Sequence, residues 1–311
     1  MTQSASISRI TILGTGLIGS SIGLALREHG FSGTITGWDR DGAQLHVALS
    51  RGAIHTAAEE PFSAAAASDL ILLSGPVFSI LEWMNELAPI LRPEQLATDV
   101  GSVKRVVCER ARGLFNAPGQ ATFLPGHPMA GKEVHGAQHA DGSLFRNAVW
   151  LFTPCTDSPV SVPEGRERME EWRRWVQAFG SRVMDLDATR HDELCAWVSH
   201  LPQLVSTALS ALLEGRFPED EDLRAIGGRA LREMTRLGAS PYSMWRDIAH
   251  TNSEPIQASL LALEQRLAHL RENLRTPELR DEFEQANRFR LGPARAASPP
   301  ETEPDPTDHE G

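Results

Sequence analysis

The sequence predicts an α/β protein in which a parallel sheet covered by helices is followed by an all-helical region. In the first half, short apolar runs alternate with stretches of helical period, the pattern of strand–helix–strand units. From about Ala188 the strand-like runs disappear and only helical patterns follow. A chain of 311 residues is also long enough for two domains. We therefore expect two folded regions, residues 1–187 and 188–291.

Five apolar runs in the first half are expected to be strands of the sheet. Helical patterns or turn residues separate them, and the helix in SSIGLALREHG should stop at Gly30, because glycine tolerates the left-handed conformation at a helix end. The five runs are RITIL (9–13), TITGW (34–38), DLILLS (69–74), ATFL (121–124) and AVWLF (148–152).

Two long helices are expected in the second half. The first starts with the capping-box pattern of Thr189 and Asp192, should kink near Pro202, and has apolar residues at helical spacing: Leu194, Val198, Leu201, Val205, Leu209 and Leu212. The second, from Ser253 to about Asn273, has a narrow seam of Ile256, Leu260, Leu263, Leu267 and Leu270. Packing within one chain and a dimer interface both explain this seam.

Composition excludes several classes of protein. The net charge of −11, from 30 basic and 41 acidic side chains, argues against nucleic-acid binding and against a polybasic membrane anchor. No apolar run is long enough for a transmembrane helix, and the N-terminus does not resemble a signal peptide. Residues 292–311 are rich in proline and acid, so we expect a disordered tail whose role the sequence does not indicate.

The cysteines give no sign of a disulfide framework or a metal site. Cys108, Cys155 and Cys195 are widely spaced and form no CxxC pair, so no metal is expected and the reducing cytoplasm is the simplest compartment.

A glycine-rich motif follows the first expected strand and opens the first helix. Gly14, Gly16 and Gly19 form G-x-G-x-x-G in the strand–helix context that dinucleotide binding requires. Gly14 allows a tight turn, Gly16 lets a pyrophosphate approach the backbone, and Gly19 lets the helix pack against the strand. Leu17 and Ile18 complete the loop at the helix N-terminus, where the phosphates would sit. Residues 1–187 are thus expected to bind a dinucleotide.

The second expected strand ends in GWDRD, which predicts NAD in preference to NADP. Asp39 lies 20 residues after Gly19, where a carboxylate accepts hydrogen bonds from the ribose and repels a 2′-phosphate. Arg40 weakens this preference, because an adjacent arginine can hold a phosphate. Ser74 and Pro76, after the third strand, are expected beside the nicotinamide.

Two chemistry-bearing residues follow neighbouring strand signals. Ser102 lies in DVGSVK and His127 in the loop GHPMAGKEVHG, so both should reach the carboxyl edge of the sheet. A dehydrogenase acting on an alcohol needs a base for the hydroxyl proton, and histidine suits this at neutral pH. The alternative for His127 is a structural histidine in a solvated loop.

The segments GTGLIGSS, DVGSVK, GHPMAG, RHDELCAWVSHLPQ and TRLGASPYSMWRDI, in this order, resemble the prephenate dehydrogenase (TyrA) family from about Arg9 to the C-terminal helices. The resemblance implies a Rossmann-like NAD domain, a helical dimerisation domain and a homodimer. It also implies NAD-dependent oxidative decarboxylation of prephenate to 4-hydroxyphenylpyruvate, in tyrosine biosynthesis.

The resemblance further implies roles for individual residues. His127 would accept the proton of the ring hydroxyl, Ser102 would orient that hydroxyl and the cofactor, and Arg236 would bind a substrate carboxylate. Glu133 matches an acid at the mouth of the site. Independently, a dicarboxylate in an acidic protein needs a local cation, and arginine offers two parallel donors.

Several positions leave alternatives open. Glu233 could pair with Arg236 on one helix face, Trp245 could line the ring pocket or the core, and His191 and His200 are expected to be structural rather than catalytic. Gln203 stands where some family members have histidine, and Lys132 where others have threonine, so both should approach the substrate side chain and arogenate is an alternative substrate. A 3-hydroxyacid dehydrogenase of similar two-domain plan is less compatible with the sequence, because it would usually rely on a catalytic lysine in the helical half. The only lysines of this chain, Lys104 and Lys132, lie before that half. A regulator that binds NAD without turnover is the alternative outside enzymes.

Overall fold

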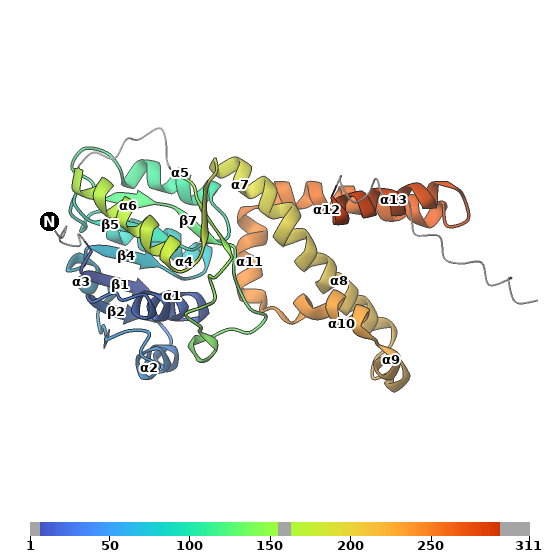
Figure 1. Ribbon diagram of the computed structural model, residues 1–311, viewed down its shortest axis with the longest axis horizontal. Coiled ribbons are helices and arrows are strands. Elements are labelled where there is room, and N and C mark those ends of the chain that lie inside the picture. The colour runs from blue at the N-terminus through green and yellow to red at the C-terminus, as the bar shows by residue number, and fades with distance from the viewer. Residues whose placement is uncertain (1–6, 155–162, 293–311) are drawn as a thin grey trace, which may run out of the picture. The chain divides into compact units, whose positions relative to one another are not determined.

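The computed structural model describes residues 7–154 and 163–292 (Figure 1). The chain divides into two compact units, Met1–Ile256 and Gln257–Gly311. The acidic tail predicted from residue 292 onward therefore lies outside the described residues except for Gly292, and so does Cys155. Within the described ranges, no helix combines the length and hydropathy needed to cross a bilayer.

A six-stranded parallel sheet forms the centre of the first unit, in the order β3-β2-β1-β4-β5-β6. Its strands are β1 (Arg9–Leu13), β2 (Thr34–Trp38), β3 (Thr56–Ala57), β4 (Leu70–Leu73), β5 (Leu96–Asp99) and β6 (Thr122–Leu124). The order reverses direction between β1 and β4, and ligands bind doubly wound sheets at such a switch point. The expected Rossmann-like class is confirmed.

Helices connect the strands and cover the sheet. They are α1 (Leu17–Glu28), α2 (Gly42–Ser50), α3 (Pro61–Ala66), α4 (Val77–Leu87), α5 (Arg105–Leu114) and α6 (Pro163–Ala178). The end of α1 agrees with the sequence prediction, since Gly30 follows it with φ of +86°. Residues Leu70–Leu73 are buried throughout, as expected for a strand covered on both faces.

A second sheet of three strands corrects one sequence prediction. The run at 148–152 forms β8 (Val149–Phe152), but β8 does not join the parallel sheet. It lies between β7 (Gly126–Pro128), its antiparallel partner, and β9 (Arg182–Asp185), a parallel one. Length and hydrophobicity identified the strand but carried no information about its partner. His127 consequently lies in a short strand paired with Leu151, rather than in the loop that the sequence suggested.

The helical region begins with a continuous run of three segments: α7 (Ala188–Cys195), a π-helical turn (Ala196–His200) and α8 (Leu201–Arg216) (Figure 1). The predicted irregularity near Pro202 is this turn, because proline has no N–H for the regular ladder. The predicted cap at Thr189 is wrong. Asp187 caps α7 by accepting hydrogen bonds from the backbone of Thr189 and Arg190, at 2.9 and 3.1 Å.

The predicted apolar face of this run is not its buried face. Val198 and Leu212 are 63% and 67% exposed. The buried positions are instead mostly polar: His191, Asp192, Cys195, Ala196, His200, Gln203 and Ser206. A π-turn brings residue i+5 over residue i, so His200 lies on the same face as Cys195.

Short helices complete the first unit: α9 (Glu221–Ile226), α10 (Arg229–Thr235), a 3-10 turn (Arg236–Ala239) and α11 (Tyr242–Thr251). Helix α11 packs on α4, where Asp247 accepts a hydrogen bond from the backbone of Phe78 at 3.2 Å. The predicted helix from Ser253 is α12 (Ser253–Glu272), which crosses the boundary between the units, and α13 (Glu278–Leu291) follows it.

Candidate active site

The glycine loop after β1 has the geometry that its three glycines predict. Gly14 has φ of +95°, and a side chain there would collide with the carbonyl of Ser74. A Cβ at Gly19 would lie 2.1 Å from the oxygen of Gly14, so only glycine lets α1 approach the turn. A Cβ at Gly16, in contrast, would meet nothing within 4 Å. Gly14 and Gly19 thus pack tightly against the protein backbone, whereas the space beside Gly16 is free.

The N-terminus of α1 is available to an anion. No side chain of residues 7–154 or 163–292 caps Gly16, and the first turn, which starts with Leu17 and Ile18, has no acidic residue. The backbone N–H groups of such a turn attract phosphate. Across the switch point, Ser74 follows β4 and its hydroxyl is buried without a hydrogen-bond partner among the described residues. Pro76 is exposed and precedes α4.

Asp39 lies next to this loop at the end of β2. Its Oδ2 accepts a hydrogen bond from the backbone of Thr15 at 2.7 Å, and its Oδ1 accepts one from Asp41 at 2.9 Å. The carboxylate is therefore fixed beside the glycine loop, as a ribose-binding acid should be. Arg40 is exposed, and no ion pair of it is found in the described part of the chain.

The DVGSVK segment turns around a buried ion pair. Asp99 and Lys104 are both fully buried, and the ammonium of Lys104 binds Oδ2 of Asp99. Asp99 also accepts hydrogen bonds from the backbone of Gly101, at 2.8 Å, and of Gly126, at 3.1 Å. The carboxylate thus joins the loop that holds Ser102 to the start of β7, one residue before His127.

Two side chains in a row, His191 and Asp192, orient the imidazole of His127. The Nδ1 of His127 lies 2.9 Å from Nε2 of His191, and Nδ1 of His191 lies 2.7 Å from Oδ1 of Asp192. Asp192 is itself held by the backbone N–H groups of Lys104 and Arg105, at 2.7 and 2.9 Å. The start of α5 is therefore capped by the same carboxylate that orients the histidines.

This row determines the tautomer of each ring. A carboxylate only accepts, so Nδ1 of His191 carries the proton and its Nε2 has the lone pair. That lone pair accepts from Nδ1 of His127, and the lone pair of His127 is then on Nε2. His127 can take a proton at Nε2 while its other nitrogen is fixed.

Burial keeps these imidazoles neutral. Burial lowers the pKa of His127 well below the ordinary 6.5, and the nearby His191 and the ammonium of Lys104 lower it further. The pKa of His191 is also lowered by burial, although the hydrogen bond to Asp192 acts in the opposite direction. Cys195, 3.6 Å from Nε2 of His191, has a pKa raised to about 12 by burial and is a neutral thiol.

Arg236 is placed by two contacts. Its guanidinium forms an ion pair with Glu133, six residues beyond His127 in the chain. The turn that holds Arg236 is fixed by Gln203, which donates to the carbonyl of Leu237 at 2.6 Å and accepts from Ser240 at 3.1 Å. The suggested pairing of Arg236 with Glu233 is wrong, because Glu233 binds Arg229 at 2.6 Å. Both groups of the Gln203 amide are therefore used within the protein.

The indole ring of Trp245 packs against the imidazole ring of His200. Their ring centroids are 5.8 Å apart, with the planes nearly perpendicular. Asn252 lies 3.2 Å from Nδ1 of His200, which leaves Nε2 of His200 buried without a partner among the described residues. Burial lowers the pKa of His200 to about 4.

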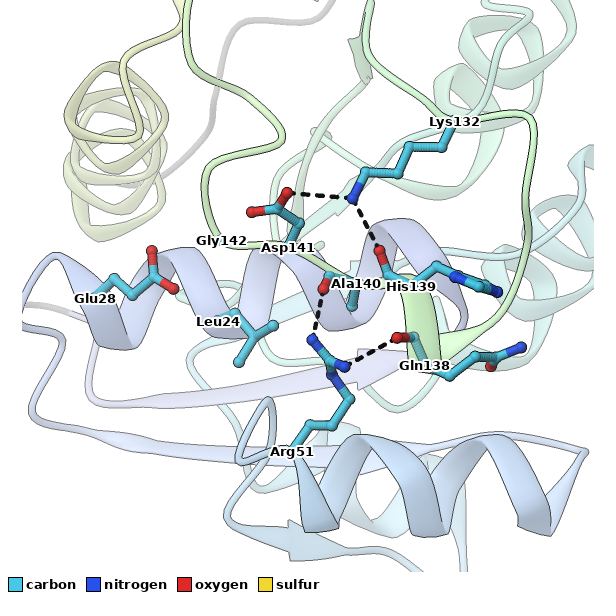
Figure 2. Close-up of a pocket in the computed structure, with 9 residues that line it drawn as sticks. All are labelled: Leu24, Glu28, Arg51, Lys132, Gln138, His139, Ala140, Asp141 and Gly142. Atoms are coloured by element: carbon cyan, nitrogen blue, oxygen red, sulfur yellow. Dashed lines mark hydrogen bonds and ion pairs between the residues drawn. The ribbon is translucent and has the colours of Figure 1, made fainter.

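Lys132 borders an open hollow of about 510 Å³ between α1, the end of α2 and the segment 138–142. Figure 2 shows its ammonium directed to Asp141, 3.2 Å away, and to the carbonyl of His139 at 3.1 Å. Arg51 binds the carbonyls of Gln138 and Ala140 in the same hollow. The structure thus gives Lys132 partners different from those of Arg236 and Gln203.

Sequence reasoning missed His191, Asp192 and the Asp99–Lys104 pair as parts of this site. Two signals were present. His191, Cys195 and Gln203 recur at helical spacing on one face, although an apolar pattern on the same helix was the stronger signal. Lys104, one of only two lysines, is followed by an apolar helix face and so was a candidate for burial.

Two family models match consecutive parts of the chain. Residues 22–184 match the family model described as prephenate dehydrogenase, nucleotide-binding domain. Residues 187–287 match the model described as prephenate dehydrogenase, dimerization domain. The first match alone covers more than half of the chain.

Individual relatives agree with these matches. The chain is 30% identical to a prephenate dehydrogenase of Lactococcus lactis over 249 residues, which are 80% of this chain and 66% of that protein. It is 30% identical to the Bacillus subtilis prephenate dehydrogenase over 65% of its length. The chain thus spans slightly less than two thirds of both.

Among solved structures, prephenate dehydrogenase from A. aeolicus in complex with hydroxyphenyl propionate and NAD+ is similar with a TM-score of 0.82. The two are 28% identical, and the similarity covers 93% of this chain and 99% of that one. Synechocystis arogenate dehydrogenase has a TM-score of 0.70 and 29% identity, with 91% and 99% covered.

Proposed function

Because the chain belongs to the prephenate dehydrogenase family, we propose that it oxidises prephenate with NAD and releases CO₂ to give 4-hydroxyphenylpyruvate. The observation that carries the proposal is the row Asp192–His191–His127, which leaves a lone pair on Nε2 of a buried, neutral imidazole. Such a group suits removal of a hydroxyl proton at neutral pH.

The residues of this chain divide the work of the reaction. The glycine loop and Asp39 would hold NAD, which would supply the acceptor for the hydride of the ring carbon that carries the hydroxyl. His127 takes the hydroxyl proton at Nε2, and Ser102 orients the hydroxyl. Loss of the ring carboxylate as CO₂ then makes the ring aromatic. Because His191 holds the other nitrogen of His127, little reorganisation accompanies the proton transfer.

Arg236 binds a carboxylate of the substrate. Its guanidinium has five N–H donors, so it can hold Glu133 and a substrate carboxylate at once. The side chain is 56% exposed, which leaves donors accessible. Glu133 acts as a positioning residue, because the ion pair with Arg236 ties the guanidinium to the segment that follows His127.

The open position at Gly16, the uncapped start of α1 and the hydroxyl of Ser74, which has no partner in the described part of the chain, fit a dinucleotide. Asp39 favours NAD over NADP through its charge. A homodimer is supported by the match to a dimerization domain and by Val198 and Leu212, apolar side chains exposed on one helical run.

The decisive experiment follows NADH absorbance with prephenate as substrate, in wild type and His127→Asn. We expect turnover in the wild type and a kcat lower by roughly 10²–10⁴-fold in the variant, the usual contribution of a general base. Calorimetric binding of NAD without turnover of prephenate or arogenate would instead identify a dinucleotide-binding regulator.

Arogenate is the second candidate substrate, supported by the similarity to an arogenate dehydrogenase. Arogenate carries an amino group where prephenate carries a keto group. Gln203 already binds Leu237 and Ser240, so we propose that it acts mainly by placing Arg236. Side-by-side kcat/KM values for both substrates in wild type and Gln203→His test this. A variant that loses only arogenate turnover would show direct contact with the amino group instead.

A further inference from the structure

Three ligand atoms of the kind that bind transition metals converge beside His127. They are Nδ1 of His127, Nε2 of His191 and Sγ of Cys195, and all lie within 4.8 Å of one another. The nitrogen atoms are 2.9 Å apart, and the sulfur lies 3.6 Å from His191 and 4.0 Å from His127. All three residues are buried.

These separations are close to those around a tetrahedral zinc ion. Zn–N bonds of about 2.0–2.1 Å and a Zn–S bond of about 2.3 Å imply N···N near 3.3 Å and N···S near 3.5 Å, as order-of-magnitude targets. The distance from Cys195 to His191 fits without change. The two imidazoles need to separate by a few tenths of an ångström, and the sulfur needs to approach His127 by about as much.

The surroundings already orient one ligand for a metal. Asp192 accepts the proton of Nδ1 of His191 at 2.7 Å, which leaves the lone pair of Nε2 directed at the cluster. A carboxylate behind a ligating histidine is the usual support in zinc proteins. The helix provides the rest, since His191 and Cys195 are separated by one turn of α7.

We propose that His127, His191 and Cys195 bind a borderline divalent cation such as Zn²⁺, with Co²⁺ as its spectroscopic substitute, and that binding switches the enzyme off. The inhibitory part rests on the proposed function, in which Nε2 of His127 is the base. A metal on Nδ1 of His127 places the ring proton on Nε2 and so removes the lone pair that the reaction needs.

The proton balance of binding is defined. The thiol of Cys195 loses its proton to solvent as the sulfur–metal bond forms, while the proton on Nδ1 of His127 moves to Nε2 by exchange with solvent. His191 already has its lone pair on the ligating nitrogen. One proton is therefore released for each cation bound.

Charges near the cluster limit the affinity but do not prevent binding. The ammonium of Lys104 opposes a cation, and it is paired with Asp99. Asp192 and the thiolate that forms on Cys195 favour the cation. The site has only three protein ligands, is buried, and lies near an ammonium group. It should therefore bind Zn²⁺ more weakly than a structural zinc site with four protein ligands.

The test uses the full-length protein, freed of metal with a chelator and titrated with Co²⁺. Binding at the cluster should give a thiolate-to-cobalt charge-transfer band and intense tetrahedral visible bands, both removed by Zn²⁺. Cys195→Ser and Cys195→Ala should lose the charge-transfer band. Cys108→Ser is the matched control, because Cys108 is a buried thiol that contacts Thr153 instead of the histidines, and this variant should keep the band. Near-ultraviolet circular dichroism verifies that each variant is folded.

Calorimetry with Zn²⁺ in two buffers of different ionisation enthalpy should give one proton released per ion. Dehydrogenase activity should fall as the site fills and return with chelator, and Cys195→Ser should need at least tenfold more Zn²⁺ for the same inhibition. No charge-transfer band in the wild type, or a band that persists in both Cys195 variants, would overturn the metal site. A bound metal with unchanged turnover would leave the site intact and refute Nε2 of His127 as the base.

Discussion

Replacing His191 tests how His127 is oriented. His191→Leu removes the acceptor for the Nδ1–H of His127, while His191→Gln keeps an acceptor oxygen at a similar distance but loses the bond to Asp192. In wild type the two bonds of the row are 2.9 and 2.7 Å long, and both histidines are buried. The rate lost in the leucine variant therefore measures how much the reaction gains when His127 is held in one tautomer.

The expected size of the effect comes from the buried N–H that the leucine variant leaves without a partner. An unsatisfied buried donor costs about 1–3 kcal/mol, or roughly 5- to 150-fold in rate if the cost falls on the productive tautomer. We therefore expect kcat to drop by about 10- to 100-fold in His191→Leu, with KM changed much less. His191→Gln should recover most of the loss.

The assay is initial-rate NADH formation from prephenate across pH, with thermal unfolding as the measure of folding. The pH profile should move in His191→Leu, because His191 helps to lower the pKa of His127. His29→Leu is a suitable control, since His29 is an exposed histidine that binds Ala25 on α1. A folded leucine variant with kcat within twofold of wild type would refute the orienting role of His191.

Three more outcomes are expected. Arg236→Gln should raise KM for prephenate about 10- to 100-fold with little change in kcat, because a charge-assisted hydrogen bond of about 1.5–3 kcal/mol is lost; a fall in kcat alone would contradict the role in substrate binding. Asp39→Asn should reduce the preference for NAD over NADP by about tenfold, one charge-assisted bond, in kcat/KM measured with both cofactors; an unchanged ratio would place the nucleotide ribose elsewhere. Urea unfolding should show stability decreasing as the pH falls from 6.5 toward about 4, because burial depresses the pKa of His200 in the folded state. The unfolded chain then binds more protons in that window, which corresponds to about 3 kcal/mol for this one group. His200→Phe should make this slope shallower, with the buried His127 and His191 accounting for what remains, and an equally steep profile in that variant would count against His200.

Local patterns predicted the parts of the fold that depend on nearest neighbours. The glycine loop, the first four predicted strands and the helix from Ser253 follow from turn chemistry, buried β-runs and helical period. The strands that pair with β8 could not be predicted in this way, because an apolar run of four residues is equally compatible with either sheet. The cap of α7 was misassigned because Asp187 and Thr189 are both good capping residues and only the fold determines which one is used.

The candidate site shows the same division between local and long-range information. The sequence pointed to His127 and Arg236, but the partner of each lies far away in the chain: His191 is 64 residues from His127, and Glu133 is about a hundred from Arg236. The π-turn also changes the face on which His200 lies, and no regular helical period predicts that. His191, which was expected to be structural, is the imidazole that contacts the proposed base.

The anchoring of Arg236 through Gln203 has a consequence for protein engineering. The guanidinium sits on a short 3-10 turn, yet the position of that turn is set by an amide on α8 and by the hydroxyl of Ser240. Transplanting residues 235–239 from another member of the family would bring the arginine without Gln203 and Ser240, the two side chains that hold the turn in place. Mutant libraries aimed at new carboxylate substrates should therefore vary positions 203 and 240 together, because the two side chains fix the turn jointly.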